Sequence, residues 1–204
     1  MYVYMSNEKQ LQLKMLGYNT YEVNGQISVS EDGHIKDIKY QKGQQMQPCY
    51  TGCILNFHTH PHDYQTLYPD HPSTTDYKYI HTATCKLKEL SAHLVVTPKY
   101  LYVIYYNCPN PLLKIFDVLT ISWRIENRFR RVSENWDRSS ENFRIEYMQE
   151  MRDLGFHIER FEWGDEIQFE IPQNAIFFNL VVYIGLFLCL FFIIKKIFFI
   201  TNVQ

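Results

Sequence analysis

The longest apolar run of the chain lies near its C-terminal end and sets the broadest limit on what the chain can form. Ala175–Ile194 (AIFFNLVVYIGLFLCLFFII) is a run of 20 residues without a charge, and a lysine pair follows it. As an α-helix, such a run is about 30 Å long, which matches the hydrocarbon core of a bilayer. Buried helices of globular domains are usually shorter and carry a polar stripe, whereas Asn179 and Tyr183 are the polar residues of this run. We therefore predict a transmembrane anchor at residues 174–200.

The rest of the chain, residues 1–174, has the length of one domain and a mildly acidic composition. It contains 18 basic and 22 acidic residues, a formal charge of −4. Because nucleic-acid binding requires a basic surface, we expect no nucleic acid among the partners. The five cysteines of the chain are an odd number, and Cys49 and Cys53 lack a second pair to complete a zinc site. We expect reduced, unpaired thiols.

Two features bear on the side of the membrane on which the domain lies. The first residues of the chain contain no apolar run of the kind that a signal peptide needs, which favours a cytosolic domain. The lysine pair after Ala175–Ile194 favours the opposite orientation by the positive-inside rule, but so short a tail can cross a membrane with little resistance. We expect a membrane protein with one C-terminal span and a cytosolic domain.

Strand patterns fill the front of the chain and helical patterns follow them. Runs of β-branched and aromatic residues, separated by turn sequences, predict two hairpins, a central strand and two closing strands. These are Val23–Val29 with His34–Tyr40, His93–Val96 with Tyr100–Tyr106, Thr51–Phe57, Phe156–Phe161 and Ile167–Ile171. Helices are expected at Glu8–Leu16, from Ser73 to about Leu90, and in two pieces between Pro111 and Leu154 that divide at Ser139–Ser140. The expected fold class is α/β, with a β-sheet flanked by helices.

The residues that carry chemistry gather in two short segments, Phe57–Pro61 (FHTHP) and Pro72–Asp76 (PSTTD). In a strand, side chains two residues apart point to one face, so His58 and His60 would direct both imidazoles into one space. With Asp76 on a nearby helix, they would form a set of two nitrogens and one oxygen. Such a set suits Zn²⁺ and leaves a fourth position to water. The other histidines are expected to be surface or core residues.

Together with an upstream glutamate, these segments resemble the motif of the JAMM (MPN-plus) zinc metalloproteases. That motif is a glutamate, then H-x-H-P, then S-x-x-D, and its parts here are Glu22–Gly25 (EVNG), His58–Pro61 and Ser73–Asp76. The resemblance covers about residues 8–108 and implies a JAMM/MPN-type sheet flanked by helices. It also implies that the two histidines and the aspartate are zinc ligands.

The resemblance implies a role for two further residues. Zinc would lower the pKa of a bound water to about 7, Glu22 would act as general base, and Ser73 would hydrogen-bond the oxyanion of the tetrahedral intermediate. The residues alone leave plainer alternatives open. Glu22 could be an ordinary surface carboxylate, with Glu31 the next candidate for the base, and Ser73 could be only a helix cap.

The chain departs from the family pattern in one place. The family usually has seven residues between the second histidine and the serine, whereas 12 separate His60 from Ser73 here. The longer loop is rich in tyrosine and proline and is expected to arch over the rim of the site. Tyr64, Leu67 and Tyr68 would then lie near the substrate path.

These inferences give a layout and a function. We predict a JAMM-like zinc-binding core at residues 1–110, a helical extension with closing strands at 111–173, and the membrane anchor. The expected function is that of a membrane-tethered zinc metalloprotease or isopeptidase, similar to a deubiquitinase. Its substrates would be proteins or peptides such as ubiquitin-like conjugates. The composition resembles that of JAMM-like membrane proteins of large DNA viruses, which implies a viral membrane.

Two other functions remain open from the sequence. The first is a structural or scaffolding membrane protein, such as a virion component, that keeps this fold while its catalysis is dispensable. The second is a phosphoesterase with several metals, which would need further clusters of histidine and aspartate. After Asp76 the remaining histidines, His81, His93 and His157, are isolated in the sequence.

Overall fold

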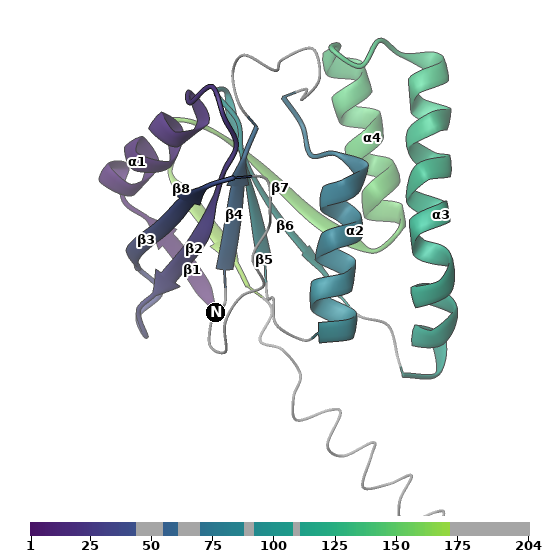
Figure 1. Cartoon of the computed structure of the whole chain (residues 1–204), viewed down its shortest axis with the longest axis horizontal. Helices are drawn as coiled ribbons and strands as arrows, with labels where there is room; N and C mark the ends of the chain where they lie inside the picture. Colours follow the sequence, from purple (N-terminus) through teal and green to yellow (C-terminus); the bar gives the residue numbers. More distant parts are fainter. Residues whose placement is uncertain (44–54, 61–69, 88–91, 108–110, 172–204) are drawn as a thin grey trace, which may run out of the picture. The chain divides into compact units, whose positions relative to one another are not determined.

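The computed structural model describes residues 1–43, 55–60, 70–87, 92–107 and 111–171, and Met1–Pro172 form one compact unit. Its main feature is a six-stranded sheet (Figure 1). In spatial order, the strands are β3 (Ile35–Lys42), β2 (Val23–Val29), β4 (Leu55–Thr59), β5 (Ala92–Val96), β6 (Tyr100–Tyr106) and β7 (Phe156–Glu162). The β4–β5 pair is parallel, and the other neighbouring pairs are antiparallel.

The sheet lies between two layers of other elements (Figure 1). One face carries the helices α2 (Thr74–Thr82), α3 (Pro111–Asn135) and α4 (Glu141–Asp153), and a π-helical turn, η2 (Ala83–Leu87), follows α2. The other layer consists of α1 (Asn7–Gly17) and a two-stranded antiparallel sheet of β1 (Tyr2–Met5) and β8 (Ile167–Glu170). The mixed α/β fold with a sheet flanked by helices is therefore confirmed.

Strand β4 is buried on both faces, and its two faces differ in chemistry. Leu55 and Phe57 pack into the core shared with α1, β1 and β8. Because side chains alternate along a strand, Asn56 and His58 point to the opposite face, toward the helix α2. A central strand thus carries two polar side chains, Asn56 and His58, on a buried face, and His58 is one of the residues of the site described below.

Gly25 of β2 lets the ring of Phe57 pack against the backbone of the neighbouring strand. A Cβ atom at this position would lie 2.2 Å from the carbonyl oxygen of Lys39 and 2.6 Å from the Phe57 ring. Real Cβ atoms do not approach so closely, so no other residue fits without a shift of the sheet. The glycine of the EVNG segment therefore has a packing reason of its own.

Most predicted elements are present. Both hairpins are confirmed as β2–β3 and β5–β6, and the closing strands as β7 and β8. The central strand is present as β4 from Leu55, and its predicted first residues, 51–54, lie outside the described residues. The division of the long helical segment is confirmed by α3 and α4, with Ser140 as the N-cap of α4. The described part of segment 111–173 forms the helices α3 and α4 and the strands β7 and β8. Strand β7 belongs to the six-stranded sheet and β8 to the two-stranded sheet. The sequence patterns did not identify β1, which pairs with β8.

Helix α3 carries two apolar stripes rather than one. Ile121, Ile125 and Val132 are buried in the core on the helix face of the sheet. Leu119 and Trp123, which share the helical spacing, are 74% and 68% exposed. The helical spacing of apolar residues predicted the helix, but it could not show which apolar stripe packs against the sheet.

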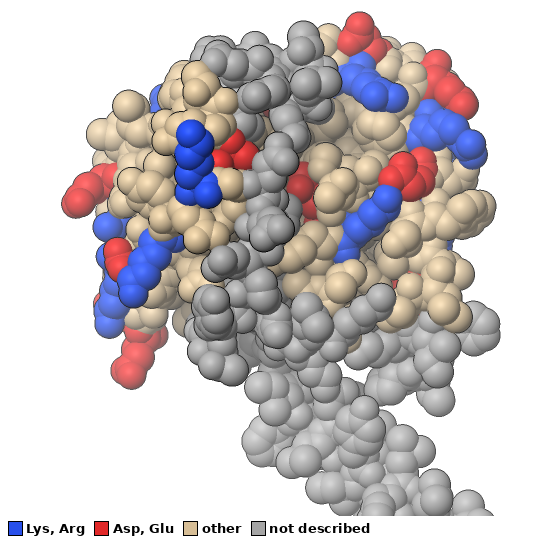
Figure 2. All heavy atoms as spheres, viewed as in Figure 1, with Lys and Arg blue, Asp and Glu red and all other residues tan. Residues whose placement is uncertain are grey.

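Charged side chains on this side of the molecule are interspersed in sign (Figure 2). The ion pairs of α3 and α4 include Lys78 with Glu126, and Arg128 and Arg131 with Glu150. The two helices therefore present an ion-paired surface.

The expectations for the cysteines and for the membrane span meet different outcomes. Cys85 of η2 is disulfide-bonded, so the prediction of reduced, unpaired thiols is wrong at this position. Among the residues that the structure describes, no helix is long and apolar enough to cross a membrane. The predicted span Ala175–Ile194 lies outside them, as do Cys49, Cys53 and loop residues 61–69.

Candidate metal centre

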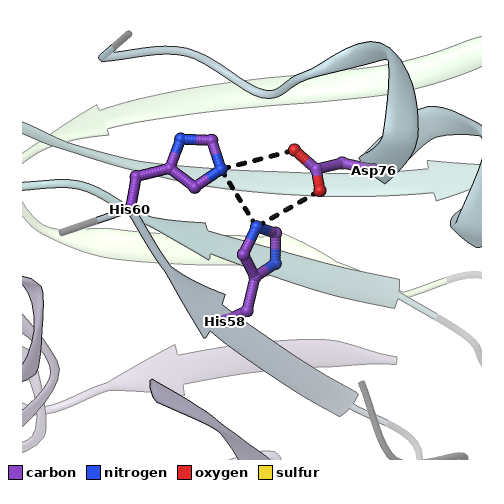
Figure 3. Close-up of side chains that lie close together, drawn as sticks. All are labelled: His58, His60 and Asp76. Carbon is purple, nitrogen blue, oxygen red and sulfur yellow. Dashed lines mark hydrogen bonds and ion pairs between the residues drawn. The ribbon is translucent and has the colours of Figure 1, made fainter. Parts of the chain in front are cut away.

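Two histidines and one aspartate converge between β4 and the start of α2 (Figure 3). His58 lies on β4 and His60 just beyond its end, where its backbone N–H donates to the Val96 carbonyl at 2.8 Å. Asp76 comes from the first turn of α2. All three side chains are buried, and one ligand atom from each lies within 4.8 Å of the others. The sequence prediction that these residues form one group is confirmed.

The donor atoms of the three side chains lie close enough together to surround one metal ion. The Nε2 atoms of His58 and His60 are 3.0 Å apart, and each lies near one carboxylate oxygen of Asp76, at 3.2 Å and 3.4 Å respectively. In a tetrahedral site with bonds of about 2.0–2.1 Å, neighbouring ligand atoms are roughly 3.3 Å apart. The residues could therefore hold an ion without rearrangement of the backbone.

The N-terminus of α2 fixes the orientation of Asp76. The backbone N–H of Ser73 donates to Asp76 Oδ2 at 2.6 Å, and Ser73 Oγ accepts from the Asp76 N–H at 3.3 Å. This reciprocal pair is a capping box, which satisfies two donors at the helix start. Ser73 is thus a helix cap.

Glu22 lies at the same end of the sheet as the cluster. Asn24 of β2 stands opposite His58 of β4, and continuing this antiparallel register by two residues sets Glu22 opposite His60. Beside it, the Val23 N–H donates to Thr59 Oγ1 at 2.9 Å. Glu31, the alternative base, is exposed in the turn at the opposite end of β2 and does not join the site.

The charge states of these groups suit metal binding. Burial lowers the pKa of His58 to about 4, so its ring is neutral near pH 7. Burial opposes ionisation of Asp76, but the two histidines hold the pKa of that carboxyl well below its usual range. Burial raises the pKa of Glu22 to about 7, while the neighbouring His60 and Asp76 act on it in opposite directions. The site thus combines a ligand carboxylate with a second carboxylate suited to exchange protons at neutral pH.

Sequence reasoning missed three residues behind His58. His93 of β5 contacts the Nδ1 atom of His58 through its Nε2 atom at 2.7 Å, and Asn56 and Tyr79 continue the contact. A signal was present, because His93 is the one polar residue of the strand AHLVV, and Asn56 lies two residues before His58 on the same strand. Polar residues at such positions need buried partners.

The end of the long loop is anchored beside the site. The Tyr102 hydroxyl donates to the carbonyl of Asp70 at 2.6 Å, and Lys99 pairs with the Asp70 carboxylate at 3.1 Å. His71 is buried against the rings of Phe143 and Tyr147 of α4. The residues immediately before Ser73 are therefore fixed, while Tyr64, Leu67 and Tyr68 lie outside the described residues.

The chain matches no protein-family model, no curated protein and no solved structure in comparisons with each. The likeness to the JAMM motif therefore rests on the buried cluster of His58, His60 and Asp76 and on its order in the chain. Chemically, such a cluster can hold a divalent ion.

Proposed function

We propose that this protein is a hydrolase with one zinc ion per chain, which cleaves peptide or isopeptide bonds. The observation that carries the proposal is the buried set of two imidazole nitrogens and one carboxylate, with one ligand atom from each residue within 4.8 Å of the others. Two nitrogens and one oxygen are a set that zinc prefers, and three protein ligands leave a position open. Zn²⁺ bound there would supply a water nucleophile that ionises near neutral pH.

Glu22 is the proposed general base. Its pKa of about 7 allows it to accept a proton from the attacking water and to return it to the leaving amine at neutral pH. It precedes Val23, the first residue of β2, at the end of that strand where Asn24 stands opposite His58. Both properties support Glu22 over Glu31 for this role.

Ser73 is the proposed donor to the oxyanion. Because its Oγ atom accepts from the Asp76 N–H, the hydroxyl is oriented while its own proton can still be donated. A donor held in advance stabilises the developing negative charge without reorganisation. The capping role and the catalytic role are therefore compatible.

The proposal extends to substrate and location. By the resemblance to JAMM proteases, the substrate is a peptide or isopeptide bond, such as the bond that follows a ubiquitin-like modifier. The apolar run Ala175–Ile194 would tether the enzyme to a membrane, with the domain in the cytosol, and the same resemblance points to a viral membrane.

The test uses the full chain, purified in detergent and loaded with Zn²⁺, on a panel of ubiquitin chains and ubiquitin-like conjugates. We expect cleavage by the wild type and none by H58A. The matched control is H157A, which removes an exposed histidine and should cleave like the wild type. A wild type that binds zinc but cleaves no conjugate or peptide would refute the hydrolase and favour the scaffolding protein.

A further inference from the structure

A buried series of hydrogen bonds leads from His58 away from the metal position. His58 Nδ1 and His93 Nε2 are 2.7 Å apart, and the two rings are stacked with their centroids 4.9 Å apart. His93 Nδ1 contacts Asn56 Oδ1, and the Asn56 amide donates to the Tyr79 hydroxyl at 2.7 Å. We call His93, Asn56 and Tyr79 the histidine relay.

The fold brings the relay together from three elements. Asn56 stands opposite His93 in the parallel β4–β5 register, and Asn56 and His58 share a face because they are two residues apart. Tyr79 lies three residues after Asp76 on α2, so both side chains are on the helix face toward β4. The relay therefore joins β4 and α2, the two elements that carry the ligands, to their neighbour β5.

The chemistry of the relay assigns a direction to its hydrogen bonds. The Oδ1 atom of an asparagine can only accept, so His93 Nδ1 carries the proton in their contact. A neutral imidazole has one N–H, so His93 Nε2 is an acceptor, and His58 Nδ1 must donate to it. His58 Nε2 then bears a lone pair, and this is the atom that faces His60 and Asp76.

We propose that His93 is a positioning residue: held by Asn56 and Tyr79, it fixes His58 in the one neutral tautomer that can bind a metal through Nε2. This inference deepens the proposed function and rests on it for the identity of the site. Ligand histidines commonly donate their second N–H to a carboxylate, a carbonyl or water. Here the acceptor is a second histidine, whose own state is set by an asparagine.

The surroundings of His93 keep it neutral. The residue is 1% exposed, and burial holds its pKa well below the usual value. The edge of the Tyr79 ring packs against it at a centroid distance of 5.4 Å. A reversed Asn56 amide would make His93 donate to His58 and would place a proton on the Nε2 atom that must bind the metal. In the structure the Asn56 amide N–H donates to the Tyr79 hydroxyl, which leaves Oδ1 to face His93.

The first measurement uses the metal-free wild-type chain, selectively labelled at histidine, and heteronuclear NMR of the imidazole nitrogens. We expect His58 to carry its proton on Nδ1 and His93 to carry its proton on Nδ1 as well. A proton on His58 Nε2 would overturn the proposal. This measurement needs no metal, substrate or variant.

The second measurement is Zn²⁺ and Co²⁺ affinity in the variants H93F and H93Q. Phenylalanine fills the space but cannot accept, so we expect a 10–100-fold loss of metal affinity, the usual effect of removing such a partner. Glutamine offers one acceptor and one donor, so H93Q should restore affinity to within a few-fold of the wild type. The control is H81F, which removes a buried histidine that pairs with Asp117 at 2.9 Å and should keep wild-type metal affinity.

The outcomes separate this inference from the proposed function. Wild-type metal affinity in H93F, or equal losses in H93F and H93Q, would refute the positioning role. A wild type that binds metal through His58 but cleaves nothing would refute the hydrolase and leave the relay intact. If H93F does not fold, the tautomer of the wild type still decides the question.

Discussion

Glu22 and Glu31 show how position along one strand separates two otherwise similar residues. Glu22 precedes β2 at the metal end, whereas Glu31 is exposed beyond its other end. The motif pattern singled out Glu22 and Asp76, and the shared direction of His58 and His60 followed from the two-residue period of a strand. His93 could not be predicted in this way, because no local pattern states which residue of β5 lies beside Asn56.

The variant E22Q tests the proposed base. Glutamine keeps the size of the side chain but cannot accept the proton, so hydrolysis should fall by about 10²–10⁴-fold while zinc stays bound. Zinc content and initial rates on the same preparation measure both effects. The matched control is E31Q, which should have wild-type activity. Equal activity of E22Q and the wild type would remove Glu22 from the mechanism.

Helix α2 combines a structural cap with the chemistry of the site. The pattern S-x-x-D predicted its start, and the structure shows both hydrogen bonds of the capping box. The start could be predicted because capping is local, within four residues. Strand β1 was missed because it has four residues and its partner β8 lies more than 160 residues further along the chain. Such pairing depends on packing and leaves little trace in a short segment.

Two matched cap variants separate the roles of Ser73. Ser140 caps α4 and accepts from the Phe143 N–H at 3.1 Å, far along the chain from the ligands. Loss of either cap should lower the free energy of unfolding by about 1 kcal/mol. S73A should in addition lower kcat by about 10²–10³-fold, the usual effect of a lost oxyanion donor, whereas S140A should not. Denaturant titration and kinetics measure the two effects, and equal kcat values would make Ser73 a cap only.

The whole domain buries several histidines, and their burial makes its stability depend on pH. Burial lowers the pKa of His58 and of His71 to about 4, and that of His93 well below 6.5. Between pH 6.5 and 4, the unfolded chain therefore binds protons that the folded domain does not. The contribution of these three histidines to the free energy of unfolding is fully present above pH 6.5 and is lost as the pH falls through this window.

Denaturant titration of the metal-free chain at several pH values tests this expectation. Each of the three histidines contributes a slope of up to about 1.4 kcal/mol per pH unit. Glu22, whose pKa burial raises to about 7, acts in the opposite direction and offsets about one of these three contributions between pH 6.5 and 4.5. The variant H71N removes one titrating group outside the ligand set and should reduce the remaining slope by about half. Equal free energies of unfolding at pH 7 and pH 5 would contradict the assignment of these rings as buried and neutral.

The order of strands in the sheet is a property of the whole molecule that the sequence could not supply. Each hairpin was predictable from its turn, but the parallel β4–β5 contact joins strands separated by the loop and α2. This crossover sets His58 beside His93 and places Asp76 over the polar row of β4. The anchor was predicted from hydropathy alone and lies outside the described residues.

Membrane fractionation tests the anchor. The full chain should remain with membranes after a carbonate wash, because about 20 apolar residues insert stably. A chain that ends at Pro172, the last residue of the compact unit, should be recovered in the supernatant. Release of the full chain by carbonate would refute a spanning segment. Protection of the domain from protease in vesicles with the cytosolic side outward would refute its cytosolic orientation.

The central claim is that His58, His60 and Asp76 bind one zinc ion. X-ray absorption at the zinc K-edge, combined with metal analysis of the purified full chain, tests it most directly. We predict about one zinc per chain, nitrogen and oxygen ligands at about 2.0–2.1 Å, and scattering from two imidazoles. Loss of bound zinc in H60A should accompany this result. Sulfur ligands at about 2.3 Å, or stoichiometric zinc in H60A, would contradict the assignment and place the metal at another site.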